Sequence, residues 1–209
     1  MKSVTFRPKH ETLAQKWRKP ASAFVATIGM LAALLTVPIG LGYGWHELME
    51  LGGFVLLCMA ALGRIWSLAY IAGRKNRELC QSGPYSLTRN PLYFFSFIGV
   101  VGFTLAVQNV LLGGLAAPAF LIYYAFVIRG EETRLQQLHG DNFTEYCLRV
   151  PRFWPRFAKP SGVPTVELNL IPFTRGMREA SCFLGAIVLA ELIEWAHSQA
   201  LWTTLLLPL

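Results

Sequence analysis

Residues 82–94 read SGPYSLTRNPLYF and separate two long apolar runs of the chain. Pro91 suits the first turn of a helix, because the N–H group that proline lacks has no helical partner there. Asn90, just before it, is a favoured N-cap residue. Arg89 adds a positive charge at the same point. The stretch therefore predicts the start of a helix whose first turn carries polar and aromatic side chains.

The composition indicates a membrane protein. Of the 209 residues, 54% are hydrophobic and only 15% are charged, whereas soluble domains carry about 25% charged residues. A spanning helix needs roughly 20 mostly apolar residues, and about five runs qualify. They cover approximately 21–43, 48–72, 91–107, 110–128 and 180–201. We expect one all-α, polytopic integral membrane domain over residues 1–209 with about five transmembrane helices. The first is expected to be retained, because a basic tail, 1–20, precedes it.

The positive charges alternate between connections. Lys and Arg gather in the tail, after the second run and between the fourth and fifth runs, and the other connections have none. The positive-inside rule then puts the N-terminus in the cytoplasm and the C-terminus on the opposite side. We interpret the net charge of +7 as a signal that sets the orientation of the chain in the membrane and attracts anionic lipids. We expect no nucleic-acid partner.

Only Gln108 and Asn109 separate the third and fourth runs, so we expect a tight antiparallel helical hairpin. The hairpin returns the start of one run and the end of the other to the same membrane face. Arg89 and Asn90 should then approach the pair Glu131-Glu132.

Charges at membrane depth are costly unless they are paired or functional. Two interpretations stay open, namely an Arg–Glu lock between helices and a binding site. The neighbouring aromatic residues favour a binding site for the whole set. Those residues are Tyr85, Tyr93 and Tyr146, and Arg64 of the second run can extend toward the same face.

Over residues 62–155 the chain resembles the core of the isoprenylcysteine carboxyl methyltransferase and phospholipid methyltransferase superfamily. The residues that carry the resemblance are Arg64, Trp66, Gly83, Tyr85, Arg89, Asn90, Pro91, Tyr93, Glu131, Glu132, Leu135, Gly140, Tyr146, Val150, Pro151 and Pro155. Asn90-Pro91 resembles the phosphatidylethanolamine N-methyltransferase branch. The carboxyl-methylating branch has His-Pro there, and an arginine where Val127 stands.

The resemblance implies S-adenosylmethionine as cofactor, held without a Rossmann domain in a cytoplasm-facing pocket. The cofactor-binding residues that it implies are Tyr85, Arg89, Asn90, Pro91, Tyr93, Glu131 and Glu132. An arginine suits the cofactor carboxylate, a glutamate suits its α-amino group, and tyrosine faces suit its sulfonium. Glu131 or Glu132 is the candidate general base for an amine or hydroxyl acceptor. Arg64 and Tyr146 are candidates for contacting the acceptor.

We therefore expect a methyltransferase whose acceptor is lipid-like or hydrophobic, such as a phospholipid amine or an isoprenylcysteine-like carboxylate. The alternatives are an NADPH-dependent membrane reductase related to sterol reductases and a non-enzymatic membrane scaffold. Residues 156–209 are expected to form a cytoplasmic loop and the last transmembrane helix. No metal is expected, because His46-Glu47 and Glu194-x-x-His197 lack the further ligands of zinc and di-iron sites.

Overall fold

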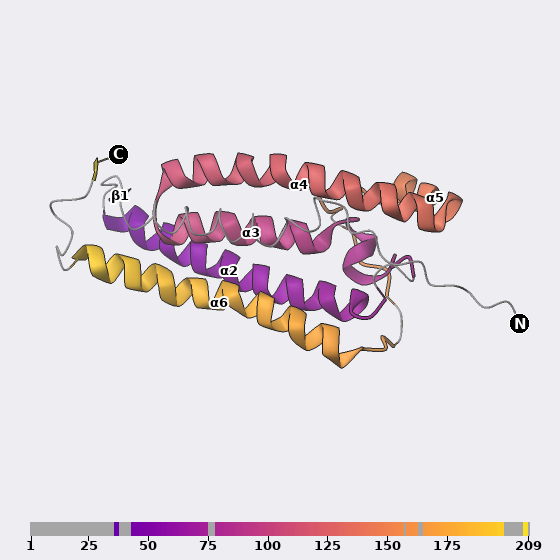
Figure 1. Ribbon diagram of the computed structural model, residues 1–209. Coiled ribbons are helices and arrows are strands. Elements are labelled where there is room, and N and C mark those ends of the chain that lie inside the picture. Colours follow the sequence, from indigo (N-terminus) through magenta and orange to yellow (C-terminus); the bar gives the residue numbers. More distant parts are fainter. Residues whose placement is uncertain are drawn as a thin grey trace, which may run out of the picture.

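The computed structural model describes residues 36–37, 43–74, 78–156, 158–162, 165–198 and 207–208, and this part of the chain is almost wholly helical. The long helices lie alongside one another (Figure 1). Two short strands pair in parallel, Thr36 with Leu207 and Val37 with Pro208. In chain order the elements are β1 (Thr36–Val37), α2 (Tyr43–Ile71), the 3₁₀ helix η1 (Gly83–Ser86), α3 (Pro91–Ala106), α4 (Val110–His139), α5 (Asp141–Arg149), α6 (Leu170–Ser198) and β2 (Leu207–Pro208).

Two helices are long and apolar enough to cross a membrane, over Trp45–Ile71 of α2 and Leu111–His139 of α4, and α3 is a shorter apolar helix. Large apolar side chains are exposed along α2 at helical spacing, as contact with lipid requires. They are Leu48, Leu51, Val55, Met59 and Leu62. The described residues thus supply two candidate spans of the predicted five or so. The predicted first span, 21–43, lies almost entirely outside the described residues.

The prediction for the last helix placed its start too late. The sequence predicts a loop up to Pro172 and a helix from about residue 180, but α6 begins at Leu170. Phe173 N already donates to Asn169 O at 3.1 Å. Pro172 lies in the first turn, where a proline needs no helical partner for its nitrogen.

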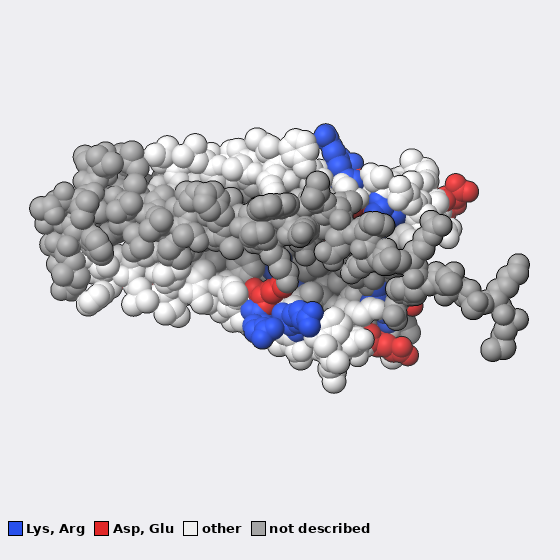
Figure 2. Space-filling model, viewed as in Figure 1, with Lys and Arg blue, Asp and Glu red and all other residues white. Residues whose placement is uncertain are grey.

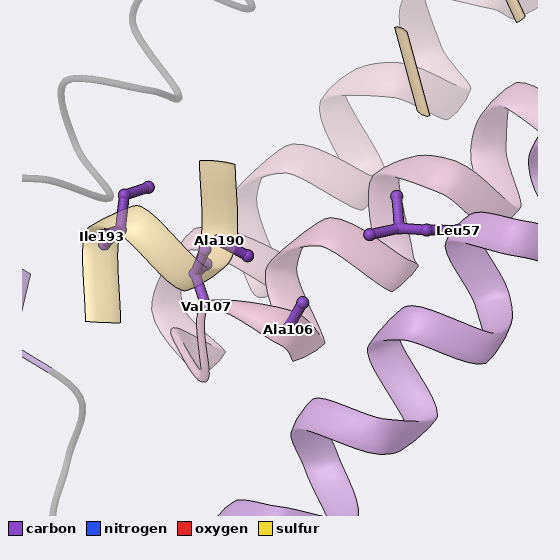
Figure 3. Packing of buried hydrophobic residues seen from close by; sticks show 5 residues of the cluster. All are labelled: Leu57, Ala106, Val107, Ala190 and Ile193. Atoms are coloured by element: carbon purple, nitrogen blue, oxygen red, sulfur yellow. The ribbon is translucent and has the colours of Figure 1, made fainter. Parts of the chain in front are cut away.

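Small residues let α2 and α3 approach closely. A Cβ atom on Gly53 of α2 would lie 2.4 Å from Ala106 N and 2.7 Å from Gly102 O of α3. Just beyond this contact, a buried apolar cluster joins α2, the end of α3 and α6 (Figure 3). Its buried members are Leu57, Ala106, Val107, Ala190 and Ile193. This packing fixes α3 against two other helices and thereby fixes the position of its first turn.

The predicted tight hairpin between α3 and α4 is confirmed. Asn109 begins α4 as its N-cap, and its Oδ1 accepts a hydrogen bond of 2.8 Å from Leu112 N. The 30 residues of α4 far exceed the 16 residues of α3. The end of α4 therefore reaches past the start of α3 and carries Glu131 and Glu132 with it. At Gly140, with φ of 51°, the chain turns into α5.

On the face drawn in Figure 2, the charged side chains of the described residues gather toward one end of the molecule. In the view of Figure 2 they lie from the middle of the molecule to its right-hand end, and the described surface at the left-hand end shows none. That right-hand end holds α5 and the connections 72–90 and 150–169 (Figure 1). The described parts of two basic connections, 72–90 and 150–169, therefore lie at one end of the bundle, while the predicted basic tail, 1–20, lies outside the described residues.

Candidate functional site

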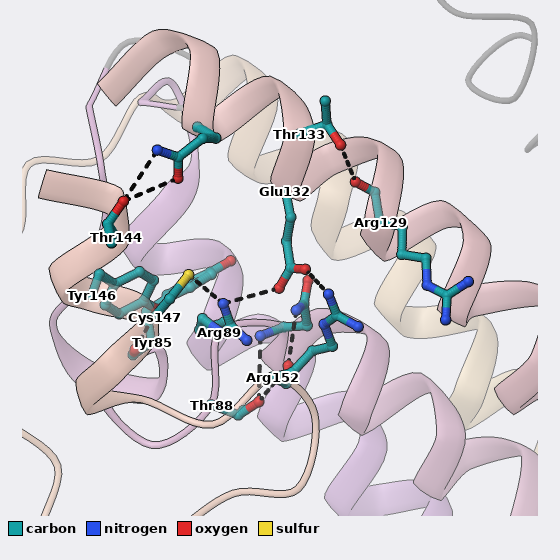
Figure 4. Close-up of polar contacts among 12 residues, drawn as sticks. Tyr85, Thr88, Arg89, Arg129, Glu132, Thr133, Thr144, Tyr146, Cys147 and Arg152 are labelled. Carbon is teal, nitrogen blue, oxygen red and sulfur yellow. Dashed lines mark hydrogen bonds and ion pairs between the residues drawn. The ribbon is translucent and has the colours of Figure 1, made fainter. Parts of the chain in front are cut away.

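A buried group of charges lies where α3 begins. Arg89 Nη1 is 3.2 Å from Glu132 Oε1, and the two side chains are only 14% and 12% exposed. Arg152 pairs with the other oxygen of Glu132, and Arg89 also donates to Cys147 Sγ. Figure 4 shows the Glu132 carboxylate between the two guanidinium groups. We call Arg89, Glu132, Cys147 and Arg152 the Arg89 cluster.

The cluster is positioned by backbone contacts between residues that are distant in sequence. Residues 87–90 run beside residues 151–156 and exchange hydrogen bonds with them. The bonds are Arg89 N to Pro151 O (2.9 Å), Arg156 N to Leu87 O (3.0 Å), Thr88 Oγ1 to Phe153 O (2.9 Å) and Asn90 Nδ2 to Arg152 O (2.8 Å). Because these contacts bridge about sixty residues of chain, the place of Arg89 depends on the segment after α5.

Asn90 occupies the N-cap position of α3, as predicted, but its side chain makes no capping hydrogen bond. Its amide instead donates to the carbonyl oxygen of Arg152. Pro91 does lie in the first turn of α3, as predicted, and is buried.

Three buried polar atoms at this site have no hydrogen-bond partner among the described residues. They are Tyr85 Oη, Arg89 Nε and Glu132 Oε1. Glu132 Oε1 is within ion-pair distance of Arg89 but outside hydrogen-bond geometry. Leaving such an atom buried and unpaired costs about 1–3 kcal/mol. A polar ligand that satisfied these atoms would recover part of that free energy.

The Tyr85 hydroxyl is held in its protonated form. The side chain is buried, with 5% of its surface exposed. Burial raises the pKa of Tyr85 well above its usual value, and the negative charge of Glu131 raises this pKa further. The hydroxyl is therefore a hydrogen-bond donor at neutral pH.

The other predicted site residues have contacts inside the fold. Tyr93 lies against Tyr124 of α4, with ring centroids 4.7 Å apart. Tyr146, 2% exposed, donates from its hydroxyl to Tyr85 O at 2.6 Å. Burial also raises the pKa of Tyr146. A role for Tyr146 in contacting the acceptor stays a prediction, while its present contact supports η1.

Arg64 links three helices. Its guanidinium donates to Ser96 Oγ of α3, lies 3.7 Å from Glu179 of α6 and sits over the Phe183 ring. A contact between Arg64 and the acceptor stays a prediction.

The sequence reasoning missed Thr88, Cys147 and Arg152. Thr88 is 2% exposed and bonds the backbone of the segment after α5. Arg152 lies within the run Val150–Pro155 that carries part of the resemblance, so its neighbourhood was marked although the residue was not. No motif or charge pattern in the sequence pointed to Cys147 as a residue of the site.

A second polar group lies at the other end of the bundle. Glu50 of α2 meets Glu191 and Glu194 of α6, and one carboxylate oxygen from each lies within 4.8 Å of the others. We call these three residues the carboxylate cluster. From the sequence, Glu194 was considered together with His197, and Glu50 was not identified as its neighbour.

The phospholipid methyltransferase family model matches residues 48–142, which include η1, α3 and the Glu131-Glu132 pair. A relative from Alcaligenes xylosoxydans xylosoxydans is 36% identical over 157 residues, covering 75% of this chain and 73% of the relative. The chain belongs to the phospholipid methyltransferase family. The predicted superfamily is thereby confirmed.

The relatives of this family member carry names from metal resistance. The Alcaligenes protein is called nickel-cobalt-cadmium resistance protein NccN. A second relative, cobalt-zinc-cadmium resistance protein CzcN of Cupriavidus metallidurans, is 35% identical over 145 residues, covering 69% of this chain and 67% of the relative. No solved structure matches the chain.

Proposed function

We propose that this family member is an integral membrane methyltransferase that transfers a methyl group from S-adenosylmethionine to a lipid-like or hydrophobic acceptor. A phospholipid amine and an isoprenylcysteine-like carboxylate are the acceptors considered. The observation that carries the proposal is the buried Arg89 cluster, which combines both signs of charge with unpaired polar atoms beside the start of α3.

The chemistry of these residues fits the cofactor. Its methionine part has a carboxylate and an ammonium group, so a site for it needs a donor and an acceptor close together. Arg89 Nε has no hydrogen-bond partner among the described residues and would donate to the carboxylate. Glu132 Oε1 is ion-paired with Arg89 at 3.2 Å but accepts no hydrogen bond from the described residues, so it would accept one from the ammonium group. The Tyr85 hydroxyl is a third unpaired donor. We propose that Asn90, Pro91 and Tyr93 complete the walls of this pocket.

The two glutamates are proposed to have different roles. Both oxygens of Glu132 face guanidinium groups, so its charge is already used to hold Arg89 and Arg152. Glu131, which is adjacent in sequence but is not one of the ion-paired residues of the Arg89 cluster, is the better candidate for the general base. When bound, the cofactor supplies an electrophilic methyl group, so the protein must mainly position the acceptor in line with it. Glu131 would take up the proton that an amine or hydroxyl acceptor releases.

The proposed placement in the membrane follows the charge pattern. About five spans with basic connections inside would put the Arg89 cluster on the cytoplasmic side, where the cofactor is dissolved. The acceptor would come from the bilayer, so membrane lipids are the expected partners. Nucleic acid and a resident metal are not required.

A transfer assay tests this proposal. The full chain, purified in detergent, would be incubated with S-adenosylmethionine labelled in its methyl group and with a bacterial lipid extract. We expect label in the lipid fraction, and its loss in Arg89→Ala but not in Arg129→Ala, an exposed arginine of α4. Binding of NADPH instead would favour the reductase alternative, and binding of neither cofactor would favour the scaffold.

A role in handling divalent metal ions is a second candidate. It is favoured by the names of both relatives and by the close carboxylates of Glu50, Glu191 and Glu194. Titration of Co²⁺ into the native chain and into Glu191→Gln/Glu194→Gln would test it. Saturable binding that disappears in the variant supports this role, and equal binding by both proteins contradicts it.

A further inference from the structure

A groove of about 470 Å³ opens beside the Arg89 cluster. Small-molecule sites usually have about 300–1,000 Å³, so this volume is sufficient for a lipid head group. Its walls are mostly apolar and come from several parts of the chain. Among them are Trp66 of α2, Pro84 of η1, and Pro91, Phe94 and Phe95 of α3. Of the residues predicted to bind the cofactor, only Pro91 lines this groove.

The charges of the groove have one sign. Among the described residues, its lining includes Arg156 and Lys159 and no Asp or Glu. Both basic side chains are exposed. Within the described ranges, neither side chain has an ion-pair or hydrogen-bond partner. Two free cations beside an aromatic wall form a surface that attracts an anionic amphiphile.

The same hydrogen bonds between residues 87–90 and the segment after α5 position both the groove and the Arg89 cluster. Arg156 N donates to Leu87 O at 3.0 Å, which holds the basic edge against residues 87–90. Thr88 lines the groove and also bonds the backbone at Phe153. Figure 4 shows Thr88 and Arg89 on adjoining parts of the same turn. A molecule in the groove would therefore lie next to the proposed methyl-transfer site.

We propose that this groove binds the phosphate-bearing head of a membrane lipid. Arg156 and Lys159 would contact the phosphate, since arginine forms paired hydrogen bonds with phosphate oxygens and lysine acts as a point charge. Trp66, Phe94 and Phe95 would pack against the glycerol and the first methylenes. The inference rests on the proposed function, because the bound lipid would be the methyl acceptor.

The net charge of the ligand distinguishes the proposed lipid head from the cofactor. S-adenosylmethionine carries two positive groups and one negative group, so it is a net cation. The described lining residues, which include two cations and no carboxylate, disfavour it and favour a phosphate. The Arg89 cluster, with both signs, has the opposite preference. The two ligands would thus occupy neighbouring but distinct sites.

Native mass spectrometry of the full chain in detergent tests the inference. The probes are dioctanoyl phosphatidylethanolamine and dioctanoylglycerol, which has the same chains and no phosphate. We expect the phospholipid to bind in preference to the diacylglycerol. In Arg156→Gln/Lys159→Gln its affinity should fall about tenfold, since exposed charge contacts are individually modest. The matched control, Arg175→Gln/Arg178→Gln, removes the same charge from exposed positions of α6 and should change nothing.

A second variant keeps both charges. Ala158 is exposed and lines the groove, so Ala158→Trp should narrow it and weaken phospholipid binding several-fold, with an unchanged melting temperature. Equal loss in the α6 control would overturn the inference, because it would indicate general surface attraction. Unchanged binding in both groove variants would also overturn it.

S-adenosylhomocysteine, titrated in parallel, separates the two proposals. If the groove variants weakened this ligand and spared the phospholipid, the groove would belong to the cofactor and the inference would be wrong. Phosphate-dependent lipid binding by a chain that binds no S-adenosylhomocysteine would support the groove as a lipid site and would contradict the proposed methyltransferase.

Discussion

The two polar clusters of the molecule lie at opposite ends of the bundle and differ in sign, burial and support. At one end Arg89 and Arg152 enclose Glu132, and the Arg89 and Glu132 side chains are largely buried. At the other end Glu50 meets Glu191 and Glu194, so that three carboxylates lie together. Glu191 and Glu194 are exposed. The first cluster is tied to the backbone of residues 151–156, whereas the second connects two helices through side chains alone.

This difference shows what each cluster is suited to bind. Balanced charges that remain partly unpaired in a buried site fit a zwitterionic ligand such as the methionine part of the cofactor. Three carboxylates of one sign repel one another and fit a cation or protons. The comparison therefore supports the proposal that methyl transfer takes place at the Arg89 end and leaves any cation chemistry to the other end.

The largest expected effect is on the methyl-transfer rate, and it distinguishes the roles of the two adjacent glutamates of α4. Glu131→Gln should lower the methyl-transfer rate about 100- to 10,000-fold, as loss of a general base does. Its affinity for S-adenosylhomocysteine should stay within a few-fold of the native value. Glu132→Gln should mainly weaken cofactor binding, because it removes the charge that holds Arg89 and Arg152. Single-turnover rates and calorimetry would distinguish them, and identical effects of both changes would contradict the assigned roles.

Arg89→Gln should lower the affinity for S-adenosylhomocysteine about 10- to 100-fold, as expected when one charged hydrogen bond is lost. Arg129→Gln is the matched control on α4, since Arg129 is exposed and lies over Phe126. Calorimetric titration measures both variants. Equal affinities in the two variants would show that Arg89 does not contact the cofactor.

Neutralising the carboxylate cluster should leave cofactor binding unchanged. In the presence of a chelator, Glu50→Gln/Glu191→Gln/Glu194→Gln should raise the melting temperature by about 2–4 °C, because like charges no longer repel. The melting curve and the S-adenosylhomocysteine affinity would be measured on the same sample. A large loss of affinity for S-adenosylhomocysteine would contradict the proposal that the two ends act independently.

The smallest effect concerns alkaline pH. Burial raises the pKa of Tyr85 above its usual value of 10.0, so the folded protein keeps a proton that the unfolded chain loses. The free energy of unfolding should therefore fall as pH rises above about 10. Tyr85→Phe should show a shallower fall in thermal melts between pH 9 and about 11. An unchanged slope would mean that Tyr85 is accessible to solvent.

Much of the framework could be predicted from short-range patterns. Apolar runs predicted α2, α3 and α4, because a helix that crosses a membrane needs a long and mostly apolar stretch of sequence. Two intervening residues, Gln108 and Asn109, allowed only a tight hairpin. That hairpin brought Arg89 and Glu132 to one end, as expected. The family resemblance then rested on residues that the structure places around the same turn.

The remaining features depend on contacts between distant segments. The side chain of Asn90 bonds Arg152 instead of capping α3, and no local rule predicts that choice. Cys147 and Arg152 join the cluster only because residues 151–156 fold back along residues 87–90. Glu50 meets Glu191 through the packing of α2 against α6. Charge pattern alone could not identify these partners.

The most direct test of the central claim is calorimetric titration of S-adenosylhomocysteine into the full chain in detergent. Thermal melting with and without ligand would verify that the protein is folded. The proposed methyltransferase should bind one equivalent saturably, with the ligand raising the melting temperature. A folded protein that binds no S-adenosylhomocysteine in two different detergents would contradict the assignment of the Arg89 cluster to this cofactor.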